Sequence, residues 1–330
     1  MANYKKEGGT GVKTYSSDPS KTYPSAFEGQ LYYNSSDGNF KFQTLGAGAW
    51  ASGGNMNTAR RSCNGAAPPS GTSSAIVFGG TPPETTYGDL SETYDGSSWT
   101  ATSNMVNKKA GRGAAGITTA VLAMGTLDGT IAPSVGTHNE EWDGSSWSEE
   151  ADINSARFDI AGFGTVTAAI AAGGDPYPAT STLVESWNGS SWTETTEINT
   201  ARGEGARGSA GISTAGLIFG GPPNNVESWD GSSWTEVAEM NTGRSAASGC
   251  GIQTAALAIG GGGPEGETEQ WNGSTWTEVA DLGTARANNG AGGTTTSAIV
   301  MGGSTQPGST RRAETEEWTY GHTLKKITLG

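Results

Sequence analysis

The stretch VESWDGSSWTE, residues 226–236, is the unit from which the fold can be read. Its centre is Asp230-Gly231, a pair that is typical of tight turns between antiparallel strands because such turns need positive φ angles. Trp229 and Trp234 flank the turn together with serine and threonine, which suits extended strands. We therefore predict a β-hairpin with a type I′ turn at Asp-Gly.

Close copies of this hairpin recur along the chain at intervals of 42 to 48 residues. The first aromatic residues of the copies are Tyr94, Trp142, Trp187, Trp229, Trp271 and Trp318. A second tryptophan follows five residues later in five copies, at Trp99, Trp147, Trp192, Trp234 and Trp276. Repeats of this length that consist of short strands indicate the blades of a β-propeller.

Two further segments complete each repeat. One is rich in glycine, alanine and serine, as in residues 245–249, and suits an innermost strand where blades crowd around an axis. The other is apolar and ends in glycine, as in residues 215–221, and its apolar residues on both faces indicate a strand buried between neighbouring blades. The remaining apolar runs are 75–80, 120–125, 168–174, 255–261 and 298–303. We predict an all-β fold of six four-stranded blades.

The two ends of the repeat array are incomplete in complementary ways. Trp318 has no following Ser-Trp strand, whereas Trp50 stands alone before the first full copy. We predict that an N-terminal strand around Trp50 completes the last blade, which removes an exposed sheet edge. The predicted domains are an N-terminal arm and hairpin (1–45), a six-bladed propeller (46–321) and a C-terminal tail (322–330).

An arginine, then Gly-Gly, then Tyr or Trp, then a second Trp recur in this order, which resembles the kelch repeat of β-propellers. The resemblance covers residues 46–321 and implies six blades. It departs from the common kelch pattern in having Trp at five of the six positions where Tyr is usual.

Each repeat also has an arginine and a glutamate at equivalent positions. The arginines are Arg60, Arg112, Arg157, Arg202, Arg244 and Arg286, and the glutamates are Glu92, Glu140, Glu185, Glu227, Glu269 and Glu316. We expect six structural ion pairs, because packing needs every blade alike whereas a binding site rarely does. The alternative is a ring of arginines that binds an anion.

Composition disfavours several classes of protein. The net charge of −14 argues against nucleic acid as a partner. No apolar run approaches the roughly 20 residues of a membrane span, and we expect no signal peptide. Cys63 and Cys250 fall in non-adjacent blades, so we expect two buried thiols and no disulfide. With only His138 and His322, we expect no metal site, no cofactor and no serine triad.

The loops after the Gly-Gly positions vary most between repeats, and on a propeller they gather on one face, where loops carry function. For binding of a glycan or a protein we single out Tyr87, Tyr177, Arg311 and Arg312. The alternative is that these loops vary because nothing constrains them.

Residues 29–42 read as a second hairpin, with aromatic strands around an Asp-Gly turn. An isolated hairpin is marginal in water, so we expect it to anchor the chain to a partner. The anchoring residues we predict are Leu31, Tyr32, Tyr33, Phe40 and Phe42.

The Gly-Gln-Leu-Tyr-Tyr-Asn segment (29–34), followed by Asp-Gly-Ser-Ser-Trp repeats, looks like structural proteins of tailed bacteriophages. The resemblance implies a non-enzymatic virion component that is assembled in the host cytoplasm, attached to other virion proteins through residues 1–45. It implies a propeller displayed for host-surface recognition, of glycan or protein, or for particle stabilisation. The sequence leaves open a homo-oligomer and the place in the particle, as tail fibre, receptor-binding tip or capsid decoration.

The repeated turn is also similar to the Asp-box of sialidase propellers, although Asp and Gly are adjacent here. That resemblance implies a glycosidase or sialidase-like enzyme acting on surface polysaccharide. Sialidase chemistry would require an arginine cluster, a tyrosine nucleophile and an acid, and the sequence does not single these out. We therefore expect a protein that is not an enzyme and keep the glycosidase as the alternative.

Overall fold

The chain divides into two compact units, residues 1–48 with 320–330 and residues 49–319. The computed structural model describes residues 13–15, 31–36, 38–68, 72–83, 88–108, 110, 113–127, 135–176, 180–203, 207–221, 224–262, 266–305 and 310–327. All elements of this described part are β-strands, and it contains no helix that could cross a membrane.

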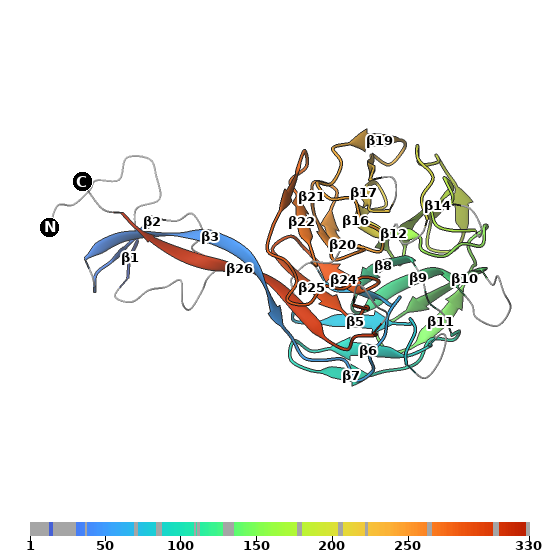
Figure 1. Cartoon of the computed structure of the whole chain (residues 1–330), viewed down its shortest axis with the longest axis horizontal. Coiled ribbons are helices and arrows are strands. Elements are labelled where there is room, and N and C mark those ends of the chain that lie inside the picture. Colours follow the sequence, from blue (N-terminus) through green and yellow to red (C-terminus); the bar gives the residue numbers. More distant parts are fainter. Residues whose placement is uncertain are drawn as a thin grey trace. The chain divides into compact units, whose positions relative to one another are not determined.

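The second unit is a six-bladed β-propeller (Figure 1). Each blade begins with a strand near the axis, and these first strands contact one another in a closed ring. We number the blades 1 to 6 by these strands: β4 (Asn64–Ala66), β8 (Gly113–Ile117), β12 (Ala161–Thr165), β16 (Gly208–Ile212), β20 (Ser248–Ile252) and β24 (Gly290–Gly293). The predicted all-β fold with six four-stranded blades is confirmed.

The other strands follow outward in each blade, antiparallel to their neighbours. The second strands are β5 (Ala75–Phe78), β9 (Ala120–Leu127), β13 (Ala168–Ala172), β17 (Ala215–Phe219), β21 (Ala255–Ile259) and β25 (Ser297–Met301). The third strands are β6 (Ser91–Tyr94), β10 (Val135–Trp142), β14 (Val184–Trp187), β18 (Val226–Trp229), β22 (Thr268–Trp271) and β26 (Thr315–Lys326). The fourth strands are β7 (Trp99–Ala101), β11 (Trp147–Glu150), β15 (Trp192–Glu194), β19 (Trp234–Val237), β23 (Trp276–Glu278) and, in blade 6, β3 (Asn39–Ser52).

Blade 6 is built from both ends of the array, as predicted. Its strands pair in the order β24, β25, β26 and β3. The rings of Trp50 on β3 and Trp318 on β26 lie 5.4 Å apart, and the Gly53 amide donates to the Thr315 carbonyl oxygen at 2.9 Å. The N-terminal strand therefore closes the propeller.

The second strands form the core between blades. In β17, Leu217 and Phe219 pack with residues of blade 5, whereas Ile218 between them packs with residues of blade 3. All three are 0% exposed, and burying such a side chain contributes about 1.5–3 kcal/mol. The expectation of a strand apolar on both faces is confirmed.

The paired aromatic residues of a blade pack against the preceding blade. In blade 5 the rings of Trp271 and Trp276 lie 5.4 Å apart, and Trp276 also lies 5.1 Å from Phe219 of blade 4. The same contact recurs between Trp147 of blade 2 and Phe78 of blade 1, at 5.0 Å. Packing of the tryptophan pairs against adjoining blades is confirmed.

The first strands are poor in side chains because neighbouring backbones approach closely there. A Cβ atom on Gly249 of β20 would lie 2.6 Å from the carbonyl oxygen of Ser209 in blade 4, closer than real Cβ atoms come. The strand begins at Ser248, so only the end of the predicted 245–249 segment belongs to it.

The hairpin turn differs from the predicted type I′. Trp229 pairs directly with Trp234, which leaves a four-residue loop. Within it the Asp230 carboxylate accepts hydrogen bonds from the amides of Ser232 and Ser233, both at 2.8 Å, and Gly231 takes a φ of 95° while Asp230 does not turn positive. The type I′ prediction is wrong because the aspartate side chain closes the loop in place of a second positive-φ residue.

The first unit contains the predicted N-terminal hairpin. Strand β2 (Leu31–Asn34) pairs antiparallel with β3, and β1 (Lys13–Tyr15) pairs parallel with β2. Asn34 faces Asn39 in the register, so this loop also spans four residues.

Candidate functional site

The repeated arginines and glutamates form ion pairs within each blade. Five of the six predicted pairs lie in the described residues: Arg60–Glu92, Arg157–Glu185, Arg202–Glu227, Arg244–Glu269 and Arg286–Glu316. Each of these arginines is at most 4% exposed. The structural ion pairs are confirmed for these five blades, and Arg112 lies outside the described residues.

Blade 3 shows the surroundings of one pair, which we call the glutamate clamp. The Glu185 carboxylate accepts from the backbone amide and side-chain Nδ2 of Asn154, at 2.7 and 2.8 Å, and from Arg157 Nη2 at 2.7 Å. Arg157 also donates to the carbonyl oxygens of Gly173 and Leu183, at 2.8 and 2.7 Å. Burial lowers the pKa of Arg157, and Glu185 opposes that shift.

The repeated arginines donate their hydrogen bonds to groups inside the blades. In the five blades whose arginine is described, these arginines do not form the anion-binding ring considered as an alternative. Each guanidinium faces the glutamate of its own blade instead. Any ligand must therefore be sought at side chains that depart from the repeat.

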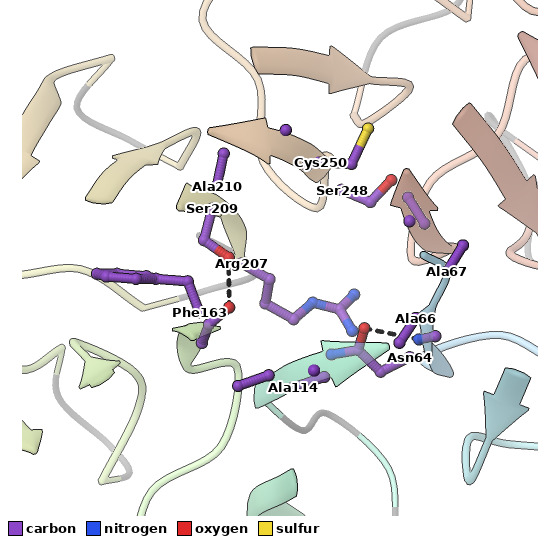
Figure 2. A pocket seen from close by; sticks show the side chains of 18 of the residues that line it. Asn64, Ala66, Ala67, Ala114, Phe163, Arg207, Ser209, Ala210, Ser248 and Cys250 are labelled. Carbon is purple, nitrogen blue, oxygen red and sulfur yellow. Dashed lines mark hydrogen bonds between the residues drawn. The ribbon is translucent and has the colours of Figure 1, made fainter. Parts of the chain in front are cut away.

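Such side chains occur in the central channel. A cavity of about 120 Å³ is lined by the first strands of all six blades and, in five blades, by the residue just before that strand (Figure 2). Cys63 and Cys250 line it as free, buried thiols, which confirms that they form no disulfide. Burial raises the pKa of both thiols, that of Cys250 to about 12, so both stay protonated at neutral pH.

Among the described residues that line the cavity, Arg207 is the charged one. It directly precedes β16, and its side chain extends into the channel (Figure 2). Its Nε lies 3.4 Å from a carboxylate oxygen of Asp159 in blade 3, and its Nη2 donates to the side-chain oxygen of Asn288 in blade 6. One arginine of blade 4 thus contacts two other blades while it is only 9% exposed.

Asn289 is an exception among the residues that directly precede a first strand. Three other blades place Cys63, Ile160 and Ala247 there. Asn289 lines the cavity and is 4% exposed, yet neither its Nδ2 nor its Oδ1 has a hydrogen-bond partner among the described residues. A buried amide without partners is costly and calls for an explanation.

Four residues that each lie two positions before a first strand share a strained backbone conformation. Ser62, Asp159, Ala246 and Asn288 all have φ between 51° and 58°, which is uncommon outside glycine. The Ser62 amide donates to the Asn288 carbonyl at 2.8 Å, and the Asn288 amide donates to the Ala246 carbonyl at 3.1 Å. These bonds tie blades 5, 6 and 1 together where the first strands begin.

The sequence reasoning missed Arg207 and Asn289 because both lie outside the repeat pattern. The sequence does contain a feature that distinguishes blade 4. Six positions separate Arg202 from the start of β16, against four between Arg286 and the start of β24. This two-residue insertion and its extra arginine mark blade 4 as different.

Of the predicted binding residues, Tyr87 and Tyr177 lie outside the described residues. Arg311 and Arg312 are partly buried in the loop before β26. Arg311 Nε donates to the Thr81 carbonyl of blade 1 at 2.8 Å, and Arg312 pairs with Glu314 at 3.0 Å. Part of their hydrogen-bonding capacity thus serves the structure, and their role in binding stays a prediction.

The predicted anchoring residues divide between the two faces of the β2–β3 hairpin. Leu31 pairs with Phe42 and Tyr33 with Phe40, so these four share one face. Leu31 is 41% and Phe40 37% exposed, whereas Tyr32, on the other face, is 1% exposed. Anchoring to a partner stays a prediction, for which the first face is the accessible one.

The described residues contain no group of three His, Cys, Asp or Glu side chains that could hold a metal ion. No protein-family model and no curated protein matches the sequence. Among solved structures, that of YjhT superposes with a TM-score of 0.65 at 13% identity, covering 82% of this chain and 99% of YjhT. This likeness supports the six-bladed propeller fold and, at such identity, nothing finer.

Proposed function

We propose that the chain is a non-enzymatic structural protein of a tailed-bacteriophage particle, attached through residues 1–45 and displaying its propeller for host-surface recognition or particle stabilisation. The resemblance of residues 29–34 to such proteins supports the proposal. So does the apolar hairpin face with exposed Leu31 and Phe40, because exposed apolar side chains gathered on one face mark sites of association.

The observation that carries the proposal is the repetition of the glutamate clamp. Five blades use their repeated charged residues in the same buried network. A repeat whose polar groups serve the scaffold leaves the loops free to vary, as in a display module. A sialidase-like enzyme has less support, because the repeat arginines that its carboxylate-binding cluster would draw on face glutamates.

The test is incorporation of the full chain into phage particles. We expect the double variant Leu31→Asp and Phe40→Asp to lose incorporation, measured by immunoblot of purified particles, while its thermal unfolding matches the wild type. Ile212→Asp is the matched control, since Ile212 is 53% exposed on the propeller. Full incorporation of the double variant would contradict anchoring through this face.

A separate experiment tests whether the propeller recognises the host surface. If the loops recognise the host, the purified protein should compete with phage for adsorption, and replacing Tyr87, Tyr177 and Arg311 should abolish that competition. If the propeller only stabilises the particle, these substitutions leave adsorption unchanged. Shortening or desialylation of host polysaccharide by the isolated protein would favour the enzyme instead.

A further inference from the structure

We propose that the central channel binds a small hydroxylated carboxylate between Arg207 and Asn289. This inference is independent of the proposed virion role, because it rests on two side chains that break the repeat. Both directly precede first strands and line one cavity. They are joined through Asn288, which neighbours Asn289 and accepts a hydrogen bond from Arg207.

Arg207 supplies the charged half of the site. A guanidinium has five N–H donors, and the acceptors near Arg207 in the described residues are Asp159 and Asn288. At least three of its donors therefore have no acceptor among the described residues. A carboxylate is the acceptor that a buried guanidinium binds best, since charge-assisted hydrogen bonds are about twice as strong as neutral ones. Asp159 offsets part of the positive charge, so we expect millimolar rather than tight binding.

Asn289 supplies the neutral half. Its amide offers donors and an acceptor, and none is used by the described protein atoms. Because the residue is 4% exposed and lines the cavity, the cavity is where a ligand can reach it. A hydroxyl group, which donates and accepts, satisfies both atoms of the amide.

The equivalent positions show that the fold does not need this amide. Blade 5 has Ala247 there, 2% exposed, and blade 1 has Cys63, 1% exposed. An apolar residue at position 289 would avoid the cost of an unsatisfied buried amide. Asparagine at this position is therefore explained by a ligand better than by packing.

The size of the cavity limits the ligand. A cavity needs roughly 10–15 Å³ to hold one water, so a volume of about 120 Å³ takes several water-sized groups. Small hydroxy acids are within this limit, whereas a polysaccharide chain is not. The cavity thus takes a small molecule or the end of a larger one.

The experiment measures binding to the full chain by ligand-observed NMR and by thermal shift. The probes are D-glycerate, malate and D-gluconate, with glycerol as a neutral control and propionate as a control without hydroxyl groups. We expect at least one hydroxy acid to bind and raise the melting temperature, and both controls to bind at least roughly tenfold more weakly.

Variants then assign the site. Asn289→Ala copies Ala247 of blade 5 and should fold with an unchanged or higher melting temperature, yet lose affinity about tenfold. Arg207→Gln should abolish binding, and Lys108→Gln, an exposed position outside the cavity lining, should preserve it. Asn289→Ala with unchanged affinity, glycerol binding as tightly as glycerate, or no binding of any hydroxy acid would overturn the proposal, and the amide would then hold only water.

Discussion

Blades 4 and 6 reach the same geometry by different routes. Blade 4 is one continuous run of chain, with its aromatic rings, Trp229 and Trp234, 5.0 Å apart. Blade 6 joins Trp318 to Trp50 from the other end of the array, at 5.4 Å. A blade is therefore defined by strand pairing and aromatic packing, and the hairpin turn is dispensable when another strand supplies the tryptophan.

The two blades differ in the completeness of the glutamate clamp. In blade 4, Asn199 donates to Glu227 from its backbone amide at 2.8 Å and from Nδ2 at 2.9 Å. In blade 6, Gly283 occupies the corresponding position and offers Glu316 only its backbone amide. The blade that closes the ring thus has the simpler clamp.

The largest effect is expected from shortening the N-terminus in two steps. Removing residues 1–45 leaves Trp50 in place, and we expect the propeller to fold. Removing residues 1–52 leaves blade 6 with three strands and an unpaired edge on β26, so we expect loss of cooperative unfolding and aggregation. Circular dichroism melting and size-exclusion chromatography distinguish the two, and equal behaviour would show that blade 6 does not need its fourth strand.

Glu227→Gln should be the most damaging single substitution in blade 4. It leaves Arg202 as a buried charge without its partner, which costs about 3–5 kcal/mol of unfolding free energy. Denaturant unfolding measures the loss, and exposed Glu239→Gln is the control, expected within about 0.5 kcal/mol of wild type. A loss below about 1 kcal/mol would mean that the pair contributes little. Glu316→Gln should show whether the simpler clamp of blade 6 depends equally on its carboxylate.

Asn199→Gly converts the clamp of blade 4 to that of blade 6. It removes the side-chain hydrogen bonds to Glu227 and to the Trp234 carbonyl, and we expect a loss of about 1–3 kcal/mol. Denaturant unfolding again gives the value. An unchanged midpoint would show that the backbone amides alone hold the glutamate.

The smallest effect concerns the turns and depends on pH. Hydrogen bonds from the following serines lower the pKa of Asp95 and of Asp143 to about 2, and lower that of Asp230 as well. Because the folded pKa lies below the unfolded value of about 3.9, these carboxylates stabilise the fold above pH 4 and lose that contribution as pH falls toward 2.

Replacing all three aspartates with asparagine, which blades 3 and 5 already carry at Asn188 and Asn272, should flatten the fall in melting temperature between pH 4 and pH 2. The melting temperature at neutral pH should change little, since the asparagine oxygens accept the same amide hydrogen bonds at 2.9–3.0 Å. An identical pH dependence in wild type and triple variant would refute this role of the turns.

The regular parts of the molecule were predictable because every blade repeats them. Five aromatic pairs and six apolar runs predicted the blades, and the unpaired Trp318 and Trp50 predicted their closure. The arginine–glutamate pairs followed from the same reasoning, since residues that recur with the repeat serve packing.

The geometry of the hairpin turn and the side chains that meet in the channel were harder to predict. The Asp-Gly dipeptide suggested a turn by its backbone preference, but the side chain of Asp230, which accepts two amide hydrogen bonds, decides the loop. Arg207 and Asn289 come together only because the ring brings blades 4 and 6 around one axis, a proximity that periodicity in the chain does not encode. Departures from the repeat deserve as much weight as the repeat itself.

Closure by the N-terminal strand also sets an order of events during synthesis. Trp318, the partner of Trp50, leaves the ribosome 268 residues after it. At roughly 5–20 residues per second, that interval lasts tens of seconds. Until then the β3 segment has no strand of blade 6 to pair with, and the finished blades have an open ring. The propeller therefore cannot close before the segment that carries Trp318 has been made.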